Sequence, residues 1–114
     1  MTANLSLEDS TITEILVTGT SVSMRGTAWN DEDLTIVFAD PLFFEDRGLI
    51  GVELSHIIVV EGSEAVEHAC NRAEEDPVRF SLMEIYGAWS DEPLFRIVAS
   101  SVSRPPLHVP EVAP

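Results

Sequence analysis

Apolar and polar residues alternate along most of this 114-residue chain, which is the pattern of β-strands that are buried on one face only. Residues that favour turns, such as Asn, Asp, Gly and Pro, separate the alternating segments from one another. We therefore predict strands over six segments: 11–18, 20–29, 34–39, 52–60, 78–86 and 94–103.

Three parts of the chain are less regular. Thr11 and Glu14 have the spacing of a helix capping box, so a short helix is the alternative to a strand at 11–18. Residues 42–51 contain two adjacent phenylalanines and are expected to form a loop or a short edge strand. Residues 1–10 are polar, and we expect them to be loose.

One segment, 63–75, has the period of a helix. Ser63 is a good N-cap, and Asp76-Pro77 stops the helix because the residue before a proline avoids the helical region. Small apolar residues recur at spacings of three and four, which predicts an apolar stripe packed closely against a sheet: Ala65, Val66, Ala69, Cys70 and Ala73.

The element order β-β-β-β-α-β-β predicts an α+β fold. Consecutive strands without alternating helices favour an antiparallel sheet or a small sandwich. The length suits one domain, which we place at 1–103. The proline-rich segment 104–114 is expected to be an extended tail.

The charge of the chain narrows the classes of partner. There are 20 Asp and Glu residues against six Arg and no Lys, and the formal net charge is −14. Such a chain repels phosphate backbones and anionic lipid, so we expect no nucleic-acid and no membrane partner. A basic protein or peptide is favoured instead, and the alternatives are that the charge only maintains solubility or reflects a high-salt host.

The expected compartment is the cytoplasm. Cys70 is the one cysteine, which leaves no intrachain disulfide and suits a reducing environment. The N-terminal residues lack the basic and apolar regions of a signal peptide, and the longest aliphatic run, 57–60, is far too short to span a bilayer.

A seven-residue segment occurs twice. Residues 28–34 (AWNDEDL) match residues 88–94 (AWSDEPL) at five of seven positions, and they contain both tryptophans of the chain. Two similar hairpin turns would explain the repeat by turn chemistry alone. If both turns lie at one end of the sheet, they also present two indoles and five carboxylates suited to a cationic partner: Trp29, Asp31, Glu32, Asp33, Trp89, Asp91 and Glu92.

Motifs of common chemistries are missing. The six glycines form no phosphate-binding loop, and there is no lysine for a Schiff base. The three histidines are far apart and there is one cysteine, so no zinc pattern exists. We therefore expect no metal, no cofactor and no catalytic residues.

The favoured hypothesis is a non-enzymatic module that recognises a basic protein or peptide. In size, charge and expected compartment the chain resembles small bacterial immunity and antitoxin proteins, although no motif carries a residue role across. One alternative is a ligand-binding or enzymatic domain with a pocket between sheet and helix that contains His56, Glu84 and Tyr86. The other is a structural homodimer formed through Ile57 and Val59, which the alternation at 52–60 places opposite the apolar face.

Overall fold

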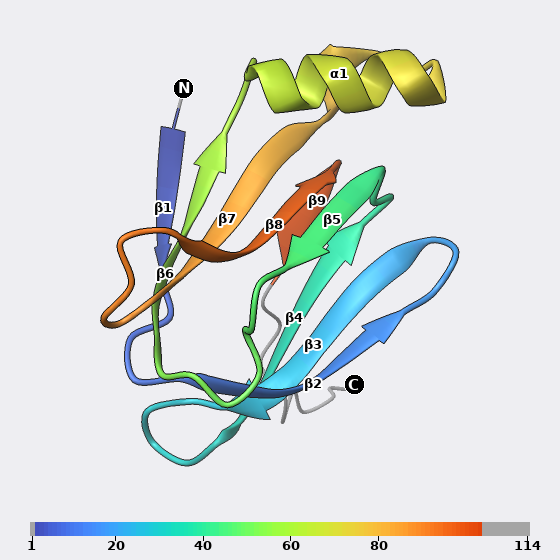
Figure 1. Ribbon diagram of the computed structural model, residues 1–114. Helices are drawn as coiled ribbons and strands as arrows, with labels where there is room; N and C mark the ends of the chain where they lie inside the picture. The colour runs from blue at the N-terminus through green and yellow to red at the C-terminus, as the bar shows by residue number, and fades with distance from the viewer. Residues whose placement is uncertain (1, 104–114) are drawn as a thin grey trace, which may run out of the picture.

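The computed structural model describes residues 2–103, and within them nine strands form two antiparallel sheets with one α-helix (Figure 1). The α+β prediction is confirmed, in its sandwich form. The predicted tail at 104–114 lies outside the described residues. The first sheet contains, in spatial order, β1 (Thr2–Ser6), β6 (Leu54–Val60), β7 (Ser81–Gly87), β8 (Pro93–Ala99) and β5 (Phe43–Asp46). The second contains β2 (Thr11–Val17), β3 (Ser21–Thr27), β4 (Asp33–Ala39) and β9 (Ser101–Ser103).

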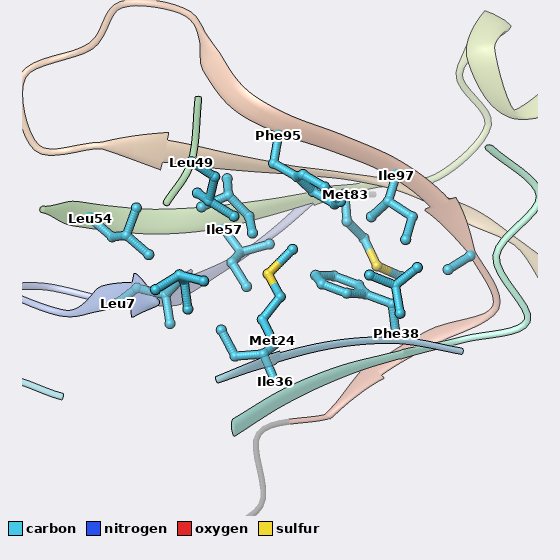
Figure 2. Close-up of a cluster of buried hydrophobic side chains, with 14 of the residues drawn as sticks. Leu7, Met24, Ile36, Phe38, Leu49, Leu54, Ile57, Met83, Phe95 and Ile97 are labelled. Atoms are coloured by element: carbon cyan, nitrogen blue, oxygen red, sulfur yellow. The ribbon is translucent and has the colours of Figure 1, made fainter. Parts of the chain in front are cut away.

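The core fills the space between the sheets. Figure 2 shows Leu54, Ile57 and Phe95 of the first sheet meeting Met24 and Phe38 of the second. The rings of Phe38 and Phe95 lie 6.2 Å apart, so aromatic contacts join the two sheets directly.

The helix α1 (Glu64–Ala73) forms where the sequence predicts it. The N–H of Val66 donates to the Ser63 hydroxyl at 3.2 Å, and Glu74 ends the helix in the left-handed conformation. Val66 and Cys70 are buried against Leu82 and Val98 on the outer face of the first sheet, as the apolar stripe predicts. A 3-10 turn, η1 (Pro77–Arg79), then leads into β7, so the strand predicted at 78–86 begins three residues later.

The predicted strand at 94–103 is divided between the two sheets. β8 ends at Ala99 in the first sheet, and β9 pairs with β4 in the second. Ser100 makes the crossing: its N–H donates to the Ala39 carbonyl at 2.9 Å, and its hydroxyl donates to the Asp40 carboxylate at 2.9 Å. Continuous β-type sequence across the crossing explains why the break was not predicted.

A bulge in β6 overturns the predicted faces of that strand. Leu54 pairs with Gly87 and His56 with Tyr86, so Ser55 is an extra residue. Ile57 is therefore buried in the core at 2% exposure and Val59 packs against the core, whereas His56 lies on the outer face. The prediction of a homodimer surface on Ile57 and Val59 is wrong, because the core already covers those side chains.

The N-terminal prediction is also wrong. Residues 2–6 form β1, which pairs with β6, and the next residue, Leu7, is fully buried. Main-chain hydrogen bonds hold this edge strand, and its polar side chains gave no sign of them. The strand at 11–18 is confirmed over the helix, and the short edge strand at 42–51 is confirmed as β5.

Gly26 supplies the sharpest test of this packing. A β-carbon there would overlap the Thr11 carbonyl oxygen and lie 2.8 Å from Ile12 Cα, both of them backbone atoms. We expect Gly26→Ala to lower the free energy of unfolding by about 3 kcal/mol, because the backbone of β2 must move. Denaturant unfolding measures this change.

Gly19→Ala is the matched control. No heavy atom lies within 4 Å of the added carbon at this exposed turn, so its effect should stay within about 0.5 kcal/mol. Equal effects at the two glycines would contradict the close approach of β2 to β3.

Candidate functional site

The two tryptophan turns lie at the same end of the sandwich. Thr27 pairs with Thr11, Thr11 forms a bridge with Glu53, and the Glu53 carbonyl accepts a hydrogen bond from Ala88 N–H at 2.9 Å. Neighbouring strands are about 4.8 Å apart, so these three steps place the main chain of Thr27, where the first turn begins, within about 15 Å of Ala88 in the second turn. Both turns point to the left in Figure 1. We call this surface, with the residues of both turns and Asp9 and Glu53, the tryptophan end.

Both indoles are open to solvent. Trp29 is 71% exposed and Trp89 is 90% exposed, values far above those of an indole that covers a core. The five predicted carboxylates are exposed as well: Asp31, Glu32, Asp33, Asp91 and Glu92. The structure therefore brings all seven predicted residues to one end of the molecule.

The two turns have different geometry despite their similar sequences. In the first, Asp31 N–H donates to the Ala28 carbonyl at 3.0 Å, and Asp31 is left-handed with φ 66°. In the second, Ser90 N–H donates to the Gly87 carbonyl at 3.4 Å. Trp29 therefore occupies the second position of its turn and Trp89 the third. The sequence repeat is not a structural repeat.

Two further carboxylates, missed in the sequence, lie between the turns. Asp9, in the link between β1 and β2, is within hydrogen-bonding reach of Glu53. That hydrogen bond raises the pKa of Glu53, and desolvation and the charge of Asp9 raise it further. The pair comes from segments 44 residues apart, so only the strand pairing brings the two groups together.

Among the described residues, Arg47 is the cation that forms ion pairs at the tryptophan end. Its Nε lies 3.1 Å from Glu45, and its Nη1 lies 3.5 Å from Glu92. These exposed pairs contribute little stability. Arg47 can engage one of the seven carboxylates of the tryptophan end, so a strong local excess of negative charge remains.

The second predicted group, His56, Glu84 and Tyr86, also comes together, on the outer face of the first sheet. The His56 and Tyr86 rings stack with centroids 5.1 Å apart, and Tyr86 OH donates to Glu84 at 3.4 Å. Arg96 Nε lies 2.9 Å from Glu84 Oε2. These three side chains already contact one another, and the groove found beside α1 is lined by other residues.

Metal ligation has no support in residues 2–103, where no group of three or more His, Cys, Asp or Glu side chains could hold an ion. Burial, with the nearby Glu75 and Asp76, raises the pKa of the Cys70 thiol, which keeps it protonated in the core. No helix among the described residues is long and apolar enough to cross a membrane.

The Asp9–Glu53 pair predicts a stability change with pH. A pKa raised by folding means that the folded state binds the proton more tightly, so stability decreases as pH rises past the ordinary pKa of Glu53. Glu53→Gln should therefore raise the melting temperature at neutral pH and have little effect near about pH 4.

Thermal unfolding monitored by circular dichroism measures this difference. Glu61→Gln, in the turn after β6, removes the same charge at another exposed site and serves as the control. If Glu53→Gln lowered the melting temperature at neutral pH, the two carboxylates would not repel each other.

Tyr86 gives a second prediction. Burial, followed by the charge and hydrogen bond of Glu84, raises the pKa of Tyr86, and Arg96 opposes this in part. Tyr86 is the one tyrosine of the chain, so the ultraviolet absorbance of tyrosinate reports it alone. Glu84→Gln should move the titration to lower pH. A midpoint unchanged by this substitution, with the fold intact by circular dichroism, would contradict the contact.

Comparison with known proteins does not assign a function to the tryptophan end. Searches of protein-family models, curated proteins and solved structures found no match for the chain. The exposed tryptophans and carboxylates of the tryptophan end are therefore the basis on which a function is inferred.

Proposed function

We propose that this protein is a non-enzymatic binding module that recognises a basic protein or peptide through the tryptophan end. The observation that carries the proposal is the exposure of Trp29 and Trp89, at 71% and 90%, beside an excess of carboxylates. A solvent-exposed indole contributes nothing to the core, and two of them at one end are typical of a binding surface.

The chemistry of the surface selects a cationic partner. The face of an indole attracts a guanidinium or ammonium group, and the turn carboxylates offer charge-assisted hydrogen bonds to the same group. The net charge of −14 adds long-range attraction that accelerates the encounter. Masking of a basic protein, as immunity proteins do, is one form of this function.

The geometry favours an extended partner over a single small cation. The two indoles stand on separate turns whose main chains begin within about 15 Å of each other, which is the span of about five residues of extended peptide. A partner with arginines spaced along such a segment can contact both indoles and the carboxylates between them.

A defined peptide tests the proposal. We would titrate a short peptide of alternating arginine and serine by calorimetry, beside a matched peptide of glutamate and serine. The arginine peptide should bind and the glutamate peptide should not. Replacing both indoles, Trp29→Ala with Trp89→Ala, should weaken binding about tenfold, because each cation–π contact contributes roughly 0.7 kcal/mol.

A pair of charge variants separates the site from the net charge. The variant Asp31→Asn/Glu32→Gln/Asp91→Asn removes three charges at the tryptophan end. The control Glu61→Gln/Glu67→Gln/Glu74→Gln removes three exposed charges in and beside α1. The first should weaken binding and reduce its dependence on salt much more than the second. Equal losses would show that only the overall charge attracts the peptide, and the proposed site would be rejected.

A further inference from the structure

A groove of about 530 Å³ runs between α1 and the edge of the first sheet. One wall is the face of α1 that carries Ala69 and Arg72, and the other is formed by Leu42, Phe43 and Arg96. The volume falls in the range of small-molecule sites. The groove is lined neither by the tryptophan turns nor by His56, Glu84 and Tyr86.

The larger part of the groove surface is apolar. Small side chains such as Ala69 bring the helix backbone close to the sheet but leave space beside the helix. Phe43 borders that space and is 45% exposed, so an aromatic face remains open to an apolar ligand. Burying such surface releases about 25 cal/mol per Å².

The charged groups that line the groove are both arginines. Arg72, Arg96 and His68 line it, and they include two of the six arginines in a chain with 20 carboxylates. Within residues 2–103, the side chain of Arg72 forms no ion pair and no hydrogen bond with another side chain. Arg96 donates to Glu84 through Nε, and its Nη atoms are further donors.

The lining of the groove contains two arginines and no carboxylate, although the chain as a whole has a net charge of −14. Three carboxylates near the groove are ion-paired: Glu84 with Arg96 at 2.9 Å, Glu45, which lies opposite Arg96 on β5, with Arg47 at 3.1 Å, and Glu75 with Arg79 at 3.4 Å. Exposed charges farther away than about 8 Å are largely screened at physiological salt. The side chains of the lining that can donate hydrogen bonds to an anion are Arg72, Arg96 through its Nη atoms, and His68.

From this combination we propose that the groove binds a small organic anion with a hydrophobic body, such as a medium-chain or aromatic carboxylate. The hydrophobic body lies along Phe43, Leu42 and Ala69. The carboxylate accepts hydrogen bonds from the guanidinium groups, whose planar fork matches it. This site is separate from the tryptophan end, and the two proposals succeed or fail independently.

Octanoate, octanamide and octylamine are the probes, since they share the hydrophobic body and differ in charge. We would follow backbone amide shifts by nuclear magnetic resonance during titration of the wild-type protein. Octanoate should shift the amides of residues 42–43 and 69–73 and bind at least fivefold more tightly than octanamide, and octylamine should bind most weakly. Equal binding of the acid and the amide, or no shifts with octanoate at millimolar concentration, would overturn the proposal.

Two variants and a control locate the contacts. Arg72→Gln should weaken octanoate about fivefold and leave octanamide unchanged. Ala73→Phe, at an exposed position on the same groove, should block both ligands without disturbing the core. Arg25→Gln makes the same charge change on β3 of the second sheet and should alter neither. An equal effect of Arg72→Gln and Arg25→Gln would reject the groove as the anion site.

Discussion

Apolar contact between the two sheets is the interaction on which the rest of this structure depends. A formal charge of −14 on 114 residues opposes compactness by self-repulsion, and few ion pairs are available to offset it. The buried side chains of both sheets, joined by contacts such as Phe38 with Phe95, supply the opposing free energy. The charged groups are consequently confined to the turns, the helix and the outer faces, where they are free to meet a partner.

The predictable parts of the fold are those that local chemistry determines. The helix was predictable because Ser63, the small apolar stripe and Pro77 all act within one short segment. The strands at 20–29 and 34–39 were predictable because their alternation runs without interruption as far as the turn. Where the structure differs, the cause is non-local: β1 is held by β6, and Ser100 leaves one sheet for the other.

A single inserted residue in β6 shows how easily the predicted faces of a strand are reversed. Alternation along 52–60 assigned Ile57 to the outside and His56 to the inside, and the bulge at Ser55 exchanges them.

The candidate site was predictable only in part. Turn chemistry located the two tryptophans, but nothing near Asp9 or Glu53 in the sequence indicated that these two carboxylates meet. The groove beside α1 was not predictable from local sequence, because it forms between the helix and a distant edge strand.

The order in which the chain visits the two sheets has a consequence for how the protein folds. The first sheet receives β1, then β5 to β8, and the second receives β2 to β4 and finally β9. Neither sheet can therefore be completed from one continuous stretch of chain, and β1 must wait for β6, about 50 residues later. Many contacts are distant in sequence, which is typical of slow folding. During synthesis β9 emerges after β1 to β8, so the second sheet is completed only after every strand of the first sheet has been made.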